Sequence, residues 1–99
     1  MSLPVRLSRE AEEELAGAAE WYEDCVDGLG DDFTDHIKAI FRRVAANPRI
    51  HQKVFRDVRR AVVKRFPYVV LYQESNSEVL VISVFHTSRD PKEWQRRIV

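Results

Sequence analysis

The sequence has little cysteine, few histidines and no long hydrophobic run. Cys25 is the only cysteine among 99 residues, so neither an internal disulfide nor a zinc site built on paired cysteines can form. The histidines are His36, His51 and His86, and no two of them have the spacing of a metal-binding pair. No apolar stretch is long enough for a membrane span or a secretory signal. These absences predict a cytoplasmic protein that uses no metal or other cofactor.

The few glycines and the single cysteine also argue against two kinds of catalytic site. The segment Gly28-Leu29-Gly30 lies between two predicted helices and lacks the Lys and Ser/Thr of a nucleotide-binding loop, so it predicts a turn. Cys25 has the acidic neighbours Glu23, Asp24 and Asp27, which disfavour the reactive thiolate. The sequence therefore favours neither nucleotide binding by a glycine-rich loop nor cysteine catalysis.

The formal net charge is zero, but the charges are divided between the two halves of the chain. Residues 1–46 contain five Lys/Arg and eleven Asp/Glu, five minus eleven being −6, whereas residues 47–99 contain eleven and five, giving +6. An acidic half and a basic half present opposite electrostatic fields if they form different faces. The basic half is therefore the better candidate for a surface that meets an anionic partner.

The acidic half predicts a short strand and two helices. Apolar residues alternate from Leu3 to Leu7, which predicts a strand near a sheet edge because Pro4 cannot donate to a ladder. Ser8 is a suitable N-cap for a helix that ends before Gly28. A second helix is expected from about Asp32, capped by Asp31 or Asp32, to the Asn-Pro pair at 47–48. The short link between the helices favours an antiparallel hairpin.

The basic half predicts three strands and a last helix. Residues 49–54 are expected to form a loop, followed by strands at about 58–66, 68–73 and 78–86 and a helix that opens at Asp90. Strict alternation in the last strand would place Leu80, Ile82 and Val84 on one face and Val79, Val81 and Phe85 on the other. Residues 1–99 are thus expected to form one α+β domain of order β-α-α-β-β-β-α, with the helical hairpin packed on an antiparallel meander.

One group of cationic and aromatic side chains comes from the predicted C-terminal strands and the loop after them. Its members are Arg59, Arg60, Arg65, Tyr68, Tyr72, His86 and Arg89. Cleavage of RNA by its own 2′-hydroxyl needs a base, an acid and a cation beside the phosphate, and His, Tyr and Arg can supply them. Without an aligned base the same residues would hold a phosphate backbone. A purely structural role for the two tyrosines and for His86 is the third interpretation that the pattern leaves open.

Several stretches together resemble the RelE/ParE superfamily of bacterial toxins from type II toxin–antitoxin systems. They are Ala-Glu-Trp-Tyr-Glu (19–23), Gly-Leu-Gly-Asp-Asp-Phe (28–33), Asn-Pro (47–48), the run from Arg59 to Tyr72, and Val-Phe-His-Thr-Ser-Arg-Asp-Pro-Lys-Glu-Trp (84–94). The resemblance covers nearly the whole chain and implies a growth-arresting toxin held inactive by a cognate antitoxin in a hetero-oligomer.

The superfamily has two branches, and they imply different targets. The RelE-like branch cleaves messenger RNA on the ribosome, whereas the ParE-like branch acts on DNA gyrase. RelE-like nucleases tend to carry an arginine at the position that Val69 occupies here, so the sequence is closer to the ParE-like branch. The resemblance then implies a target-binding or phosphate-binding surface that includes the arginines and tyrosines of the group above. In the RelE-like alternative, an mRNA interferase, His86 would be catalytic.

Overall fold

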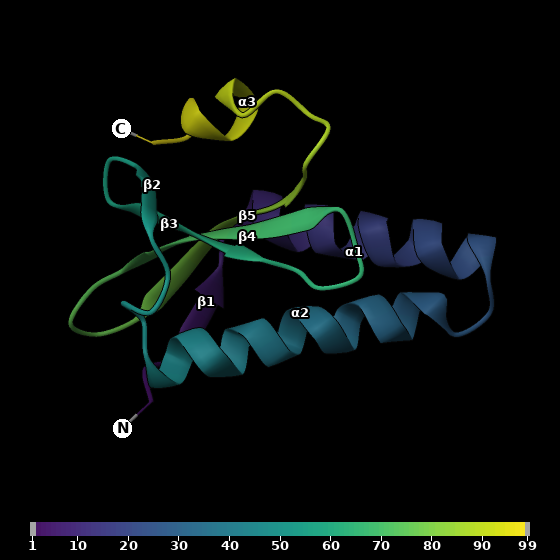
Figure 1. The fold of residues 1–99 in the computed structure, drawn as a ribbon, viewed down its shortest axis with the longest axis horizontal. Helices are drawn as coiled ribbons and strands as arrows, with labels where there is room; N and C mark the ends of the chain where they lie inside the picture. Colours follow the sequence, from purple (N-terminus) through teal and green to yellow (C-terminus); the bar gives the residue numbers. More distant parts are fainter. Residues whose placement is uncertain (1, 99) are drawn as a thin grey trace.

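The structure, a computed structural model, describes residues 2–98 and has two layers of secondary structure with a short third element (Figure 1). The elements are β1 (Val5–Leu7), α1 (Arg9–Cys25), α2 (Leu29–Ala46), β2 (Lys53–Phe55), β3 (Val58–Val62), β4 (Tyr68–Glu74), β5 (Val79–His86) and α3 (Lys92–Gln95). The predicted α+β fold, with its helical hairpin, meander and short last helix, is confirmed.

A five-stranded sheet in the order β1-β5-β4-β3-β2 forms one layer. The strands β2, β3, β4 and β5 pair antiparallel with their neighbours, and β1 pairs parallel with β5 through residues 79–81. Helices α1 and α2 cover one face of this sheet, and α3 lies over the opposite face (Figure 1). We call these the helix-covered face and the outer face.

Local chemistry explains where the two long helices begin. The hydroxyl of Ser8 accepts a hydrogen bond from the Ala11 N–H at 3.1 Å, as expected for the N-cap of α1. Helix α2 begins at Leu29, earlier than the predicted Asp32, because its first N–H groups are satisfied from outside the helix. The Glu23 carboxylate accepts from the N–H groups of Gly28 (2.8 Å) and Gly30 (3.0 Å), so neither Asp31 nor Asp32 is the cap.

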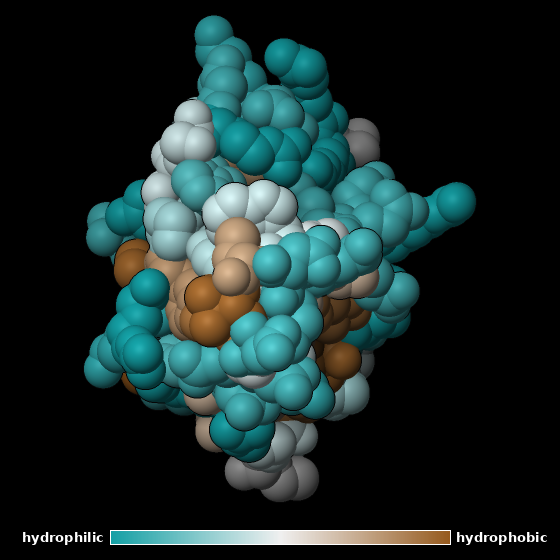
Figure 2. Space-filling model, turned by 90° about the vertical axis from the view of Figure 1, so that its right-hand side faces the viewer, coloured by the Kyte–Doolittle hydropathy of each residue, from teal (hydrophilic) through white to brown (hydrophobic). Residues whose placement is uncertain are grey.

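The turn between the helices requires both of its glycines. Gly28 has φ +86°, in the left-handed region that glycine adopts without strain. A Cβ atom at Gly30 would overlap with the carbonyl oxygen of Ala19, so α1 and α2 approach closely at this point. Val26, directly after α1, is exposed, and so is Trp21. Viewed from this end of the molecule, small apolar patches are surrounded by hydrophilic side chains (Figure 2).

Each face of the sheet has its own apolar cluster. The cluster beneath α1 and α2 is the larger one and includes the fully buried Phe33, Ile37, Val44, Val70 and Tyr72. The cluster on the outer face contains Val58, Val69, Leu71, Ile82, Phe85 and Trp94. The predicted anchoring of the last helix by Trp94 is confirmed, since this side chain is buried and its ring meets Phe55 at a centroid distance of 5.7 Å.

The prediction of strict alternation along β5 was wrong. Leu71 pairs with Ser83 and Tyr72 with Val81, so Ile82 is an extra residue at a β-bulge. The bulge reverses the alternation, and Val79, Val81 and Val84 therefore all lie in the helix-covered cluster.

Two predicted boundaries in the basic half were also wrong. Residues 53 and 54, expected as part of a loop, form the edge strand β2 together with Phe55, and β2 pairs with β3 across a tight turn containing Arg56 at φ +52°. The strand expected to continue to residue 66 ends at Val62, because residues 63–67 turn with Arg65 in the left-handed region at φ +72°. None of the helices within residues 2–98 is long and apolar enough to span a membrane.

Candidate functional site

The outer face carries a cavity of about 260 Å³ between the sheet and α3, which we call the outer-face pocket. It is lined by Val54, Arg60, Val69, Leu71, Phe85, Thr87, Arg89, Pro91, Trp94 and Gln95. Its floor is apolar, and its two charged lining residues are both arginines. An apolar floor beside cationic groups suits a partner that offers an apolar side chain together with negative charge.

The two arginines of this pocket are held very differently. Arg89 bonds Glu93 at 2.7 Å and Glu14 at 3.3 Å, and its guanidinium carbon lies 4.8 Å from the Phe85 ring centroid. The hydrogen bond to Glu93 is the main reason that the pKa of Arg89 is raised above its ordinary value. Arg60 is exposed and forms no ion pair with any residue between 2 and 98. Arg60 is therefore the more available cation.

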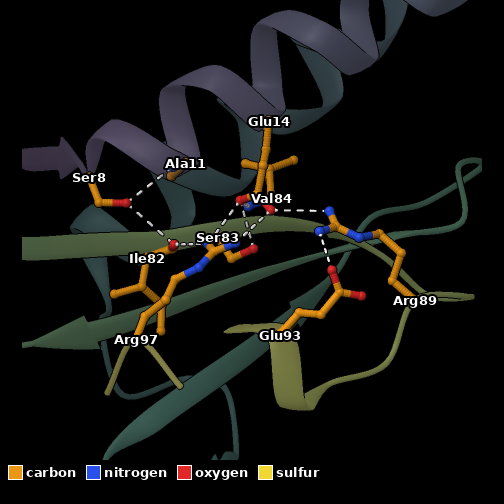
Figure 3. Close-up of polar contacts among 9 residues, drawn as sticks. All are labelled: Ser8, Ala11, Glu14, Ile82, Ser83, Val84, Arg89, Glu93 and Arg97. Carbon is orange, nitrogen blue, oxygen red and sulfur yellow. Dashed lines mark hydrogen bonds and ion pairs between the residues drawn. The ribbon is translucent and has the colours of Figure 1, made fainter. Parts of the chain in front are cut away.

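The Glu14 carboxylate organises the end of the sheet beside this pocket (Figure 3). It accepts hydrogen bonds from the Ser83 hydroxyl at 2.8 Å and from the Val84 N–H at 3.3 Å, on a stretch of β5 that β1 does not cover. It also accepts from Arg97 at 3.1 Å and from Arg89. Glu14 thus joins α1, β5 and the segments on both sides of α3, and thereby fixes one wall of the pocket.

Sequence reasoning missed the organising role of Glu14 and Arg97. A signal for Glu14 was present, because a helix buries positions three and four residues apart, and Glu14 lies between Ala11 and Ala18. A charged residue on the buried stripe of a helix needs a partner. Arg97, the partner, lies 83 residues away in sequence, and no local pattern connects the two.

Tyr68 and His86 lie opposite each other in register at the helix-covered side, with ring centroids 5.0 Å apart. The His86 Nδ1 atom accepts a hydrogen bond from the Ser88 N–H at 3.0 Å, so the neutral ring carries its proton on Nε2. Tyr68 packs among Tyr22 and Phe33, and burial is the first cause of its raised pKa. The Tyr68 phenol therefore stays protonated at neutral pH and is a poor base.

Arg59 and Tyr72 lie at the other end of the helix-covered face and have structural contacts. The Tyr72 hydroxyl donates to the Pro48 carbonyl at 2.9 Å, and the residue is fully buried. The Arg59 guanidinium donates to the His51 carbonyl at 2.7 Å and lies 3.7 Å from Glu74, with its side chain only 13% exposed. Both residues help to hold the 47–52 segment against the sheet.

The remaining cation of the predicted group, Arg65, lies in the turn after β3. Its side chain is 71% exposed and reaches Asp32 of α2 at 3.9 Å. The predicted group is thus separated: Arg60 and Arg89 share the outer-face pocket, Tyr68 pairs with His86, Arg59 pairs with Tyr72, and Arg65 is apart. Within residues 2–98, no three His, Cys, Asp or Glu side chains gather in a way that could hold a metal ion.

Comparisons with known proteins identify the family. The family model described as "ParE toxin of type II toxin-antitoxin system, parDE" matches residues 5–91. A solved structure titled "Chromosomal ParDE TA system from P. aeruginosa" superimposes with a TM-score of 0.71 at 14% identity, covering 86% of this chain and 96% of that one. At that identity the likeness concerns the fold. No protein with a curated description matches the sequence. Because the family match spans most of the chain, this protein belongs to the ParE toxin family of type II toxin–antitoxin systems.

Proposed function

We propose that this chain is a growth-inhibiting toxin that acts by binding DNA gyrase and is neutralised by a cognate antitoxin with which it forms a hetero-oligomer. The family supplies the class of protein, and the outer-face pocket supplies the candidate contact surface. Arg60 would contact the target directly, and Arg89 would shape the pocket beside it.

The composition of the outer-face pocket is the observation that carries this proposal. None of its lining residues is a histidine, aspartate or glutamate, so a group suited to take a proton at neutral pH is not present among them. Val69 lies on its floor, and an isopropyl group cannot stabilise a charged phosphorane. Cations without a general base favour binding over cleavage.

A supercoiling assay with purified DNA gyrase tests the target. The toxin should reduce supercoiling in a dose-dependent manner, and prior addition of the antitoxin should restore it. The antitoxin for this arm is a protein shown beforehand to form a hetero-oligomer with this chain. Normal supercoiling at saturating toxin would rule out gyrase as the target.

A ribosome-dependent endoribonuclease is the second candidate function, and the placement of His86 favours it. Its Nδ1 is held by Ser88, and the side chain is only partly buried, which leaves Nε2 available for proton transfer. His86 would then act as acid or base, with Arg65 or Arg89 beside the phosphate and Tyr68 aligning the substrate. Tyr72 is an unsuitable aligner because its hydroxyl is engaged by Pro48 in the core.

Messenger-RNA integrity in a purified translation reaction distinguishes this candidate from the first. Codon-phased cuts that appear with the wild-type toxin and disappear with His86→Ala would establish the nuclease. Intact message would remove it. Unrestricted growth on induced expression would instead indicate an inactive relative that retains only antitoxin binding.

A further inference from the structure

The end of the helical hairpin, where α1 passes into α2, exposes large apolar side chains. Trp21 is 62% exposed and Val26, directly after α1, is 59% exposed. Gly17 lies one helical turn before Trp21, and a Cβ atom at Gly17 would meet no side chain within 4 Å, so the helix surface beside the indole ring is bare. An exposed tryptophan offers a partner a large contact area.

The charge around this end of the hairpin has one sign. Residues 10–37 contain eleven Asp/Glu and no Lys or Arg. Glu20, Asp24 and Asp27 are exposed, and none of the three forms an ion pair with a residue between 2 and 98. We call the surface made by Trp21, Val26 and these three carboxylates the hairpin end. It presents an aromatic side chain together with uncompensated negative charge.

The outer-face pocket has the complementary composition. Its apolar floor includes Leu71 and Phe85, and its volume is about 260 Å³. Arg60, which lines it, is exposed and has no ion-pair partner among residues 2–98. A guanidinium group is attracted to the face of an indole ring more strongly than to other aromatic rings, and Trp and Arg are the residue types that dominate binding energy at protein interfaces. The pocket therefore matches a surface that this same chain carries.

A contact between these two surfaces requires two copies of the chain. The turn between α1 and α2 lies at the far right of Figure 1, whereas α3, which covers the pocket, lies at the upper left. None of the residues 20–31 lines the pocket. Phe33, Ile37 and Val44 hold α2 against the sheet in the buried cluster, so the hairpin end cannot fold back to the pocket of its own copy.

We propose that the hairpin end of one copy docks into the outer-face pocket of a second copy, with Trp21 in the pocket against Arg60. The contact is head-to-tail, because each copy contributes a different surface. The opposite charges of the two halves of the chain favour this orientation over contact between two hairpin ends. Docking covers Arg60, so it masks the surface that binds the target. This masking rests on the proposed function, whereas the docking does not.

Sedimentation velocity of the purified toxin tests the docking. Wild type should form larger species as its concentration is raised at low salt, and added salt should weaken the association because it screens the exposed charges. Trp21→Ala and Arg60→Glu should each weaken self-association by about tenfold or more. Both positions are exposed, so both variants should fold. A wild type that stays monomeric at every concentration would overturn the proposal.

Matched charge changes separate a specific contact from a general charge effect. Arg56→Glu makes the same change as Arg60→Glu on an exposed arginine that does not line the pocket. Glu12→Lys reverses an exposed charge near the start of α1, whereas Asp24→Lys reverses one beside Trp21. Only the variants at Arg60 and Asp24 should lose self-association strongly. Equal losses from the members of each pair would contradict the contact.

A smaller groove of about 190 Å³ is the competing acceptor on this chain. Val62, Arg43 and Lys64 line it, so it also combines apolar surface with cations. Lys64→Glu should leave self-association unchanged. If Lys64→Glu abolishes the association and Arg60→Glu does not, the hairpin end docks in the smaller groove and the proposal is overturned.

Mixing two deficient variants tests the head-to-tail arrangement. Trp21→Ala retains an intact pocket and Arg60→Glu retains an intact hairpin end, so a mixture of the two can form one wild-type contact. We expect neither variant to associate alone at a concentration where the mixture forms a dimer. A mixture that remains monomeric at concentrations where wild type associates would contradict docking of the hairpin end into the pocket.

Fluorescence quenching tests the same contact on the wild type. The chain has two tryptophans, of which Trp94 is buried within its own copy and Trp21 is exposed. Acrylamide should quench the emission of Trp21 in dilute toxin, and this quenching should decrease as the toxin is concentrated at low salt. Quenching that is independent of concentration while the toxin associates would show that Trp21 is outside the contact and would overturn the proposal.

The gyrase assay separates the masking from the function on which it rests. Trp21→Ala and wild type should inhibit supercoiling equally at low toxin concentration, where wild type is monomeric, and Trp21→Ala should inhibit more strongly where wild type associates. If neither protein inhibits gyrase at any concentration, the proposed function fails, and the sedimentation result still decides the docking. If both inhibit with coincident dose–response curves while wild type associates, the function stands and the masking is wrong.

Discussion

Neighbouring residues of the same type differ in burial and in polar contacts when they lie on opposite faces of the sheet. Arg59 lies on the helix-covered face, where its side chain is mostly buried and bonded to the His51 carbonyl. Arg60, the next residue, lies on the outer face, where it lines a pocket and has no ion-pair partner among residues 2–98. A cluster of cations in the sequence is therefore not a cluster on the surface, because a strand divides it between two faces.

The largest loss of stability is expected from a substitution in the apolar cluster of the helix-covered face. Phe33→Ala removes a fully buried ring that contacts Tyr22, Phe66 and Tyr68, and we expect the free energy of unfolding to fall by about 3–5 kcal/mol. Trp21→Ala is the control, since this ring is exposed and should cost roughly 0.5 kcal/mol or less. Denaturant unfolding measures both, and a similar loss in the two variants would contradict the assignment of the core.

The hydrogen bond of Tyr72 on the same face should make the stability of the protein depend on pH in the alkaline range. Tyr72→Phe leaves the Pro48 carbonyl without its donor and should cost about 1–3 kcal/mol at neutral pH. Burial raises the pKa of Tyr72 above its ordinary value of 10.0, so its contribution to stability is complete below pH 10 and is lost as the pH rises through the raised pKa. The wild type should therefore lose stability above pH 10 more steeply than Tyr72→Phe. Parallel pH profiles of unfolding free energy would count against this account.

A smaller effect is expected from Glu14, which joins the two faces at one end of the sheet. Glu14→Gln weakens its contacts with Arg97 and Arg89, and we expect a loss of about 1–2 kcal/mol together with faster hydrogen exchange in α3. The exposed Glu13, which among residues 2–98 pairs only with the even more exposed Arg9, is the control. Unchanged exchange in α3 would show that Glu14 does not hold that helix.

How much could be predicted from sequence depended on how far apart the contacting residues are. The helical hairpin, the meander and the anchoring of the last helix by Trp94 follow from local periodicity and turn residues, and they are confirmed. The bulge at Ile82 was not predictable, because it depends on the pairing partner across β4. Strand β2 has only three residues, too few for a period-2 pattern to stand out.

The candidate site was predictable only in part, for a related reason. Sequence reasoning named Arg60 and Arg89, and these two do meet in the outer-face pocket. It also named Arg59 and Tyr72, but their side chains already donate hydrogen bonds to backbone carbonyls of the 47–52 segment. The residue types suggested the chemistry, but only the sheet faces and the tertiary contacts decide which side chains remain available.

The central claim is that the outer face of the sheet carries the function. Its most direct test uses a substitution that should have the smallest effect on stability. We would measure gyrase supercoiling with wild type, Arg60→Ala and Arg56→Ala, the last being an exposed arginine of the β2–β3 turn that does not line the pocket. Arg60→Ala should change the unfolding free energy by no more than about 0.5 kcal/mol yet lose most of the inhibition, while Arg56→Ala should inhibit like wild type. Full inhibition by Arg60→Ala, or equal losses in both variants, would contradict the claim.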